Sequence, residues 1–551
     1  MVADDRLVLV TQAEFEDDSL EEDDQSCQES VEYHPPQLLL YLASLVAALG
    51  GLLFGYDVGV IAGARTLLAQ DMSLTCSQEE LVVSLMPLGA VSASIISGWL
   101  LNNLGRKYSI QFTAFLFTVG ALIMAMANNL VVVLVGRFMV GFCVSLSAMS
   151  ECTYIAEISH ATQRGRLVTL NELGITLGFL LAFIINYIFM TVESGWRYMF
   201  GLSGVVAVIQ LFCMVFLPQT PHFLVIRGKE DQASMVMKKM HGMGGMAANR
   251  EVAKIRASWQ EEKETSCSFL FSTVDNMRSR LVVGLGLVIA QQMTGQPNIM
   301  YYATDIAQSV GFCGDLLSAT ATVFLGVVKV VATVLAMMLV DRVGRRTLLL
   351  SGVGLMVASL ICLTVSATYL EHSQGFIDHQ VCVEFNIELI NSTVASACST
   401  TNLPSSVRYL SFAALVTYIT AYSFSFGPIT WVLLAELFPL NTKTQAMSLG
   451  QAVNWTVNVL VSVTFLDVVR AFTLPIVFSF YLVMSILSFI FIYFYVPETK
   501  NKTLQQISSD LKQPHSSSHK TLAPLPAVRT PPKNNNIFVA LHQLDKSDCS
   551  S

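Results

Sequence analysis

Two stretches of this sequence decide its fold, because each joins a long apolar run to a short basic end. Residues 81–107 read LVVSLMPLGAVSASIISGWLLNNLGRK, and residues 316–346 read LLSATATVFLGVVKVVATVLAMMLVDRVGRR. A helix of about 20 apolar residues spans the hydrocarbon core of a bilayer, and basic residues mark its cytosolic end. The two stretches therefore predict transmembrane helices that end in the cytosol, at corresponding places in two parts of the chain.

The composition extends this interpretation to most of the chain. Of the 551 residues, 53% are hydrophobic and 13% are charged, whereas about 25% of the residues in a soluble protein are charged. Twelve apolar runs have spanning length, at residues 38–63, 80–101, 108–128, 130–151, 167–190, 197–217, 281–303, 316–340, 347–368, 409–434, 445–468 and 474–496. A β-barrel would instead show alternation over about ten residues. The sequence predicts an all-α membrane protein with twelve transmembrane helices.

Lys and Arg set the expected orientation. Basic residues gather in the connections that would lie inside, whereas the predicted outside loops carry isolated arginines at Arg65, Arg197, Arg408 and Arg470. Both ends are therefore expected in the cytosol. The longest outside loop contains a glycosylation sequence at Asn391.

The predicted order of domains follows from the runs. Residues 1–37 and 497–551 are expected to form cytosolic tails, disordered at the N-terminus and beyond about residue 510, and residues 218–280 a cytosolic linker with short helices. Residues 38–217 and 281–496 would form two six-helix halves.

The two halves repeat one another at their cytosolic ends. Ala-Glu at the end of the fourth run recurs at the end of the tenth, and basic residues follow both. Basic residues that only fix the orientation of the helices in the membrane would explain a single cluster. They do not explain why clusters recur at matching positions in both halves. We therefore expect a cytosolic gate of charge-assisted bonds, formed by Arg106, Glu157, Arg164, Arg345, Glu436 and Lys443.

These motifs resemble the sugar-porter branch of the major facilitator superfamily, and within it the class III facilitative glucose transporters, nearest to members twelve and ten. The resemblance covers residues 38–507 and includes further motifs at Gly55-Tyr56-Asp57, Gly136-Arg137-Phe138, Gln291-Gln292-Met293-Thr294-Gly295, Gly427-Pro428-Ile429-Thr430-Trp431, Asn454-Trp455 and Pro497-Glu498-Thr499-Lys500. It implies the major facilitator fold and hexose transport by alternating access, with a substrate site between the halves.

The resemblance also implies which residues contact the sugar. The expected substrate-binding residues are Glu172, Gln291, Gln292, Gln296, Asn298, Lys329, Trp431 and Asn458. For a single amide, hydrogen bonding between helices is the competing interpretation, worth about 0.6 kcal/mol on average. Helix breaks at Pro297 and Pro428 would open the backbone toward a cavity.

Three departures from the family pattern bear on this expectation. The sixth run ends in Pro-Gln-Thr-Pro-His, so Gln219 and His222 supply no strong charge pair and the first-half gate should be weaker. Lys443 stands where Arg is usual, and lysine cannot donate the two parallel hydrogen bonds that arginine offers to a carboxylate. Pro297 occupies the position of an expected Asn, and Asn298 follows one residue later.

Charges inside the spans point to function, because a charge at membrane depth costs at least about 2.5–3.5 kcal/mol. Asp57 and Arg137 match a carboxylate–Arg pair of proton-coupled relatives, and we hypothesise that Asp57 is a proton-linked switch. A static ion pair in a uniporter is the alternative. Glu172 and Lys329 are expected to approach each other across the cavity, each offsetting the other's charge.

Other functional classes fit the sequence poorly. It contains no Gly-Lys-Ser/Thr phosphate loop, no metal-ligand cluster and no histidine inside a predicted span, so the protein is not expected to be an enzyme. No cofactor, metal or nucleic acid is expected; the expected partners are a hexose, membrane lipid and, as a candidate, protons. A sugar sensor remains open, as does residence in the plasma membrane or in endomembrane vesicles.

Overall fold

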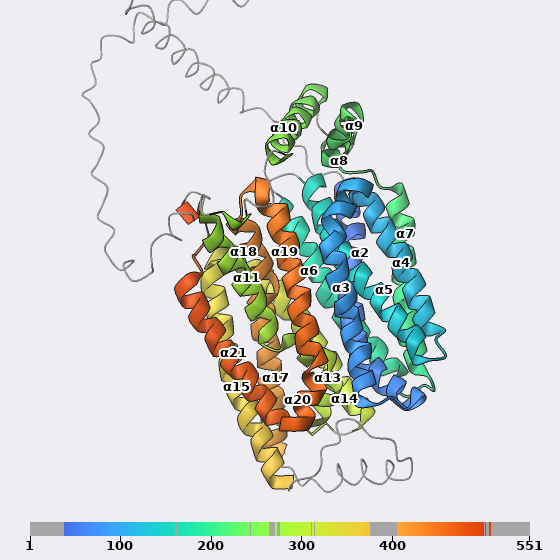
Figure 1. Cartoon of the computed structure of the whole chain (residues 1–551), viewed down its shortest axis with the longest axis vertical. Helices are drawn as coiled ribbons and strands as arrows, with labels where there is room; N and C mark the ends of the chain where they lie inside the picture. Colours follow the sequence, from blue (N-terminus) through green and yellow to red (C-terminus); the bar gives the residue numbers. More distant parts are fainter. Residues whose placement is uncertain are drawn as a thin grey trace, which may run out of the picture. The chain divides into compact units, whose positions relative to one another are not determined.

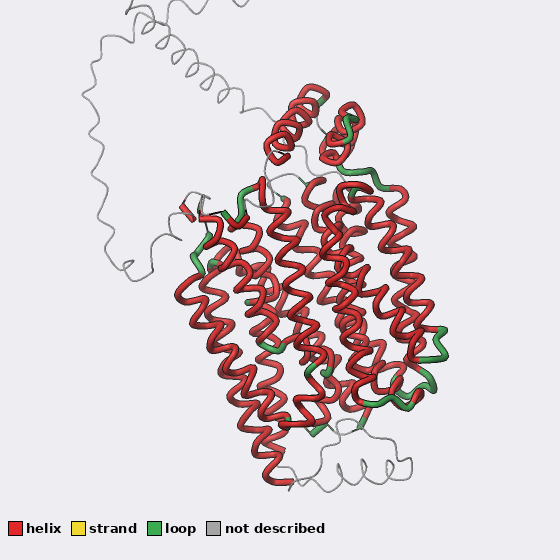
Figure 2. The backbone as a smooth tube through the Cα atoms, viewed as in Figure 1, coloured by secondary structure: helices red, strands yellow, loops and turns green. Residues whose placement is uncertain are grey.

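The computed structural model describes residues 38–159, 163–242, 244–263, 270–272, 276–309, 311–312, 314–374, 405–500, 502 and 506–507. All of them belong to one unit, which spans residues 1–512. Among these residues the regular elements are all helices, most of which run side by side (Figures 1 and 2). This is the all-α membrane architecture that the apolar runs predict. Asn391 lies outside the described residues.

The helices follow the predicted order. The first half contains α2 (Leu38–Met72), α3 (Cys76–Leu104), α4 (Arg106–Ala125), α5 (Leu130–Ile158), α6 (Arg164–Phe189) and α7 (Gly195–Phe216). The connecting segment contains α8 (Pro221–Ile226), α9 (Glu230–His241) and α10 (Gly245–Lys263). The second half contains α11 (Met277–Met293), α12 (Gln296–Tyr301), α13 (Ala303–Ser309), α14 (Asp315–Val343), α15 (Arg345–Gln374), α17 (Ser405–Phe424), α18 (Phe426–Leu437), α19 (Leu440–Val463), α20 (Phe465–Phe472) and α21 (Leu474–Tyr495).

The seventh predicted span is divided. In the described part of the chain, eleven helices are long and apolar enough to cross a membrane, and the predicted run at 281–303 is instead shared by α11, α12 and α13. Gly295 has a φ of +90° between α11 and α12, and a Cβ added there would lie 2.4 Å from the Tyr481 ring. Only glycine combines this backbone conformation with such close packing.

The second predicted break is also present. Between α17 and α18, Ser425 leaves the helical region with φ −109° and ψ −92°. Both breaks come just before the prolines expected to cause them, because Pro297 and Pro428 lie in the first turns of α12 and α18. Proline is tolerated there, since its missing N–H has no partner in a first turn.

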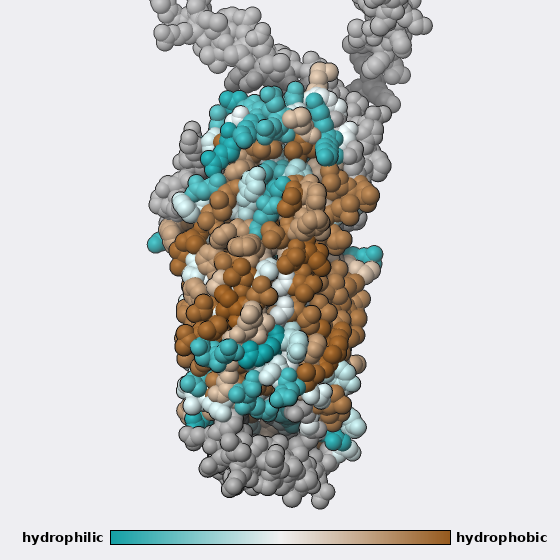
Figure 3. Space-filling model, turned by 90° about the vertical axis from the view of Figure 1, so that its right-hand side faces the viewer, coloured by the Kyte–Doolittle hydropathy of each residue, from teal (hydrophilic) through white to brown (hydrophobic). Residues whose placement is uncertain are grey.

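The two halves contact each other along two helix pairs. Helix α3 packs against α19, and α6 packs against α14, while α2 meets α12 and α13. The face shown in Figure 3 carries a mostly hydrophobic band between hydrophilic ends. Exposed Leu, Ile, Val and Phe side chains are expected in such a band, because they face lipid rather than water.

Glycine lets α2 and α6 pack backbone to backbone. A Cβ added at Gly55 of α2 would lie 1.8 Å from the carbonyl oxygen of Ile175. A Cβ added at Gly178 of α6 would lie 2.1 Å from the carbonyl oxygen of Leu52. Small residues allow this approach between membrane helices. The packing brings α6 close to the part of α2 that carries Asp57.

We predict that Gly55→Ala destabilises the protein by about 2 kcal/mol or more, since the added methyl group must force α2 and α6 apart. Gly98→Ala is the matched control, because nothing lies within 4 Å of a Cβ added at that helical position. Thermal unfolding of the two purified variants in the same detergent checks this prediction. Equal melting temperatures for both would contradict the close packing of α2 on α6.

Candidate functional site

Asp57 and Arg137 form a buried ion pair in the first half. Arg137 Nη1 on α5 lies 2.9 Å from both carboxylate oxygens of Asp57 on α2, and Arg137 Nε donates to the carbonyl of Val82 on α3 at 3.1 Å. Both charged side chains are at most 1% exposed. The predicted pairing is present, and it ties together three helices of the first half.

In the second half, an amide network joins α11 to α19. Gln292 Nε2 donates to Asn454 Oδ1, and Gln292 Oε1 accepts from Asn458 Nδ2 at 3.2 Å. The Tyr301 hydroxyl of α12 donates to Asn458 Oδ1 at 3.1 Å. Two of the predicted sugar ligands, Gln292 and Asn458, therefore hold each other in place. Tyr301 and Asn454 belong to the same network, although they were not among the predicted ligands.

Side-chain donors reach from helix to helix at the two breaks. Gln291 Nε2, near the end of α11, donates to the carbonyl of Phe426 at the start of α18, at 3.0 Å. The Tyr418 hydroxyl of α17 donates to the carbonyl of Thr294, at the end of α11, at 2.9 Å. The carbonyl of Thr294 lies at the C-terminal end of α11, where carbonyls lack helix partners, and in a membrane the protein must supply one.

Asn298 is fully buried at the start of α12. Its Nδ2 donates to the carbonyl of Val461 at 3.0 Å and to the Tyr481 hydroxyl at 2.8 Å. Its Oδ1 has no hydrogen-bond partner among the described residues. Asn298 therefore anchors α12 to α19 and α21, and it keeps one buried acceptor that a hydroxyl group can use.

Two more of the predicted ligands in this half, Gln296 and Trp431, are half-buried. Gln296 is the first residue of α12, and its amide has no hydrogen bond within the described part of the chain. Trp431 of α18 packs against the main hydrophobic core. Both side chains retain exposed surface, so each can contact a solute.

Glu172 and Lys329 lie where the two halves meet, but they do not form an ion pair within 4.0 Å. Their charges attract each other. Lys329 Nζ instead lies over the rings of Phe179, at 4.8 Å, and Tyr422, at 5.7 Å. A Cβ added at Gly427 would lie 3.7 Å from Glu172 Oε1. The approach of the two side chains across a cavity thus stays a prediction, and aromatic rings lie against Lys329 where Glu172 was expected.

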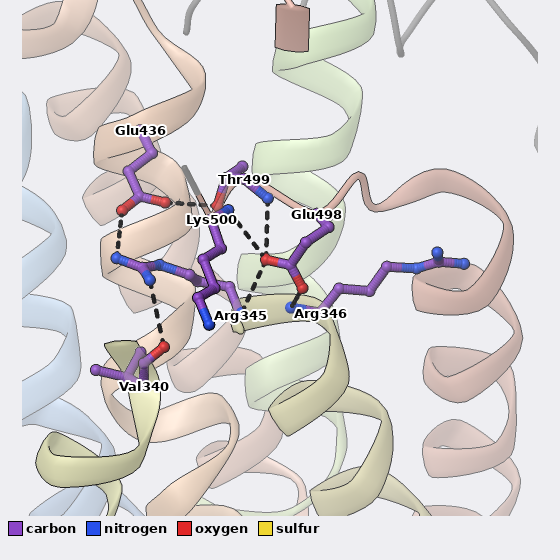
Figure 4. A network of polar contacts seen from close by, with 7 residues as sticks. All are labelled: Val340, Arg345, Arg346, Glu436, Glu498, Thr499 and Lys500. Atoms are coloured by element: carbon purple, nitrogen blue, oxygen red, sulfur yellow. Dashed lines mark hydrogen bonds and ion pairs between the residues drawn. The ribbon is translucent and has the colours of Figure 1, made fainter. Parts of the chain in front are cut away.

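At the end predicted to face the cytosol, the second half carries a dense charged network (Figure 4). Arg345 Nη2 lies 3.0 Å from Glu436 Oε1, and the Thr499 hydroxyl donates to Glu436 Oε2 at 2.6 Å. Glu498 accepts the backbone N–H groups of Arg345 and Arg346, at 3.0 and 3.1 Å. The network thus joins α15, α18 and the segment after α21, all within one half.

The first half repeats this arrangement with fewer bonds. Arg106 Nη2 lies 2.8 Å from Glu157 Oε1, and Gln219 Oε1 accepts the backbone N–H of Lys107 at 3.2 Å. Lys443 is half-buried on α19. Arg164 begins α6, but its side chain lies outside the described residues. The two pairs predicted to form the gate, Arg106–Glu157 and Arg345–Glu436, each join helices of the same half.

Across the halves, a charged cluster forms at the opposite end of the helices. Arg65 of α2 pairs with Glu79 of α3 and with Asp305 of α13, and its guanidinium lies 5.0 Å from the ring centre of Tyr302. Tyr302 stacks on Phe465 at 4.4 Å. The prediction that Arg65 is an isolated loop arginine was wrong. The first helix continues to Met72, so Arg65 lies on it, two turns beyond Asp57, and is 3% exposed.

Glu151 is a buried carboxyl group that sequence reasoning missed. On α5 it is 0% exposed, accepts from Ser147 and Gln210, and fills the space beside Gly50 of α2. Its position two turns before the end of an apolar helix is a signal that the sequence already carried, because charges at that depth are rare.

Comparison with known proteins agrees with this geometry. The family model for "Sugar (and other) transporter" matches residues 43–511. The chain is 35% identical to human solute carrier family 2, facilitated glucose transporter member 12, over 538 residues that cover 87% of each protein. It is 37% identical to zebrafish (Danio rerio) member 10, covering 86% of this chain and 93% of that relative.

Solved structures of the xylose transporter XylE from E. coli have similar folds. A partially occluded, inward-open XylE aligns with a TM-score of 0.69 at 26% identity, covering 85% of this chain and 100% of that one. XylE described as a proton:xylose symporter of the major facilitator superfamily, bound to 6-bromo-6-deoxy-D-glucose, aligns equally well at 28% identity, covering 86% and 99%. With its repeated six-helix halves, this chain belongs to the sugar transporter family of the major facilitator superfamily.

Proposed function

We propose that this protein carries a hexose, glucose by default, across the membrane by alternating access. The observation that carries the proposal is the set of buried amides around the two helix breaks, where Gln291, Gln292, Asn298 and Asn458 converge from α11, α12 and α19. Planar amides suit sugar hydroxyls because each offers donors and acceptors. The names of the relatives, as glucose transporters and a xylose transporter, support the same class of substrate.

In this proposal, the solute lies between the halves. Gln296 and Trp431 supply the half-buried surfaces, one polar and one aromatic, and Asn298 supplies an acceptor. Glu172 comes from the first half, beside Gly427 of the second. A solute that contacts both halves would couple its own binding to their relative movement.

We predict that Gln296→Ala raises the KM for labelled glucose uptake into proteoliposomes about threefold to tenfold, which is the value of one neutral hydrogen bond. Protein stability should stay unchanged, because this amide has no hydrogen bond within the described residues. Gln70→Ala, at an exposed position of α2, is the control. If the wild-type protein takes up glucose and Gln296→Ala does so with the same KM, Gln296 does not belong to the sugar site.

The Arg65 cluster is proposed to be the outer gate. Among the described residues it contains an ion pair across the halves at that end, Arg65–Asp305, whereas the two described cytosolic ion pairs lie within a half. Opening to the outside must then separate Asp305 from Arg65. Opening toward the cytosol would leave the Arg65–Asp305 ion pair intact.

We predict that Asp305→Asn speeds amide hydrogen exchange in α13 about tenfold, because it removes the charged hydrogen bond that ties this helix to Arg65 of α2. Arg65 itself keeps its pair with Glu79. Glu193→Gln, an exposed glutamate in the loop before α7, serves as the control. Exchange measured by mass spectrometry on the full chain checks this. Unchanged protection of residues 303–309 would mean that the cluster does not hold the outer side closed.

Proton coupling through Asp57 is the finer part of the proposal. When Asp57 and Arg137 separate in a low-dielectric interior, the carboxylate takes up a proton, because an unpaired buried charge is costly. The description of XylE as a proton:xylose symporter supports this possibility for a similar fold. A uniporter with Asp57 and Arg137 as a static pair is the alternative.

We predict that Asp57→Asn abolishes glucose accumulation driven by an inward proton gradient in proteoliposomes but preserves exchange of labelled for unlabelled glucose. Asn keeps a hydrogen-bond acceptor for Arg137 but cannot take up a proton, and the exchange measurement checks that the variant is folded. If the wild-type protein never concentrates glucose under this gradient, or Asp57→Asn still does, Asp57 is not the coupling residue.

A further inference from the structure

A pocket of about 430 Å³ lies at the cytosolic end of the first half, outside the proposed sugar site. It is formed by the start of α4, the segment that follows α7, and helices α8 and α9, which lie together in Figure 1. Its size falls in the range of sites for small ligands, which is roughly 300–1,000 Å³. Neither the sugar proposal nor the gate pairs use it.

The pocket is strongly basic. Its lining includes Lys107, Arg227, Lys229 and Lys239, and no Asp or Glu is among the lining residues. The side chains of Lys229 and Lys239 have no hydrogen bond or ion pair among the described residues. The neighbouring acid Glu230 is already paired with Arg256 of α10 at 2.9 Å.

Comparison of the two halves explains this excess of positive charge. In the second half, the carboxylate of Glu498 accepts the backbone N–H groups at the start of α15. At the matching place in the first half, the neutral amide of Gln219 accepts the N–H of Lys107 at the start of α4. In the wall of this pocket, the first half therefore has a neutral amide where the second half has a carboxylate.

The surroundings of the pocket match the membrane surface. Tyr108 is 55% exposed and Met235 of α9 is 60% exposed, and both line the pocket. Tyrosine prefers the level of the lipid head groups. Apolar side chains beside lysines on a helix are typical of helices that lie on a membrane. A ligand in this pocket can thus place its charged group against the lysines while its acyl chains lie in the bilayer.

We propose that this pocket binds the phosphorylated head group of an anionic membrane lipid. Basic pockets at the cytosolic face of membrane helices suit such head groups, because that leaflet carries the anionic lipids. Lys107 and Arg227 are partly engaged, since they donate to the carbonyls of Val215 and Asn103. Lys229 and Lys239 are therefore the two cations that are fully available to the phosphate groups.

The test measures binding of a short-chain phosphatidylinositol bisphosphate to the full chain in detergent, by native mass spectrometry. We expect the double variant Lys229→Gln/Lys239→Gln to weaken binding about 25-fold, since each cation near an anionic surface contributes roughly fivefold. The matched control is Lys238→Gln, which removes a charge from the same helix outside the pocket lining. It should bind as the wild type does.

Two further arms identify the source of the phosphate. Short-chain phosphatidylcholine should not compete, and soluble inositol trisphosphate should bind at least tenfold more weakly than the lipid, because it lacks the chains. Equal binding of the lipid and the soluble head group would overturn the lipid assignment. A second double variant, Lys238→Gln/Lys254→Gln, removes two charges outside the pocket. If it loses as much lipid affinity as Lys229→Gln/Lys239→Gln, only net charge matters and the proposed site is overturned.

Discussion

Hydrogen bonds between two broken helices hold the centre of the second half together. Gln291 reaches from α11 to Phe426 at the start of α18, and Tyr418 reaches from α17 to Thr294 at the end of α11. Polar backbone at membrane depth persists only where the protein itself supplies partners or a cavity is lined. The breaks therefore place amides in the membrane interior and fix their positions. The proposed sugar site follows from this single constraint.

The first half depends on a different interaction. Glycines bring α2 and α6 so close that Asp57 and Glu172 lie on helices in direct backbone contact. Asp57 is held by Arg137 on one side, and Glu172 faces Gly427 of the second half. The first half thus supplies two carboxylates to the centre, and the second half supplies the amides and Lys329. A carrier that moves a neutral solute needs the amides, and one that couples the solute to an ion also needs the charge.

Much of this could be predicted from the sequence, because apolar runs, basic ends and proline positions act locally. The helical runs and the two breaks are of this kind. The pairing of Asp57 with Arg137, 80 residues apart, was instead implied by the resemblance to proton-coupled relatives. Other contacts between distant helices could not be predicted. The apolar run that ends at residue 63 predicts a loop at Arg65, and the partner Asp305, 240 residues away, leaves no local signal that would correct it. The rings of Phe179 and Tyr422 around Lys329 were missed for the same reason.

The central claim, that this protein is a hexose carrier working by alternating access, is tested most directly by counterflow. Proteoliposomes containing the purified protein are loaded with unlabelled glucose and diluted into a trace of labelled glucose. A carrier gives a transient accumulation of label above its equilibrium level, because the unlabelled glucose inside occupies the inward-facing sites and slows the exit of label that has entered. We expect this overshoot. A monotonic approach to equilibrium would indicate a channel, and an absence of uptake beside intact binding would indicate a sensor; either result would contradict the account.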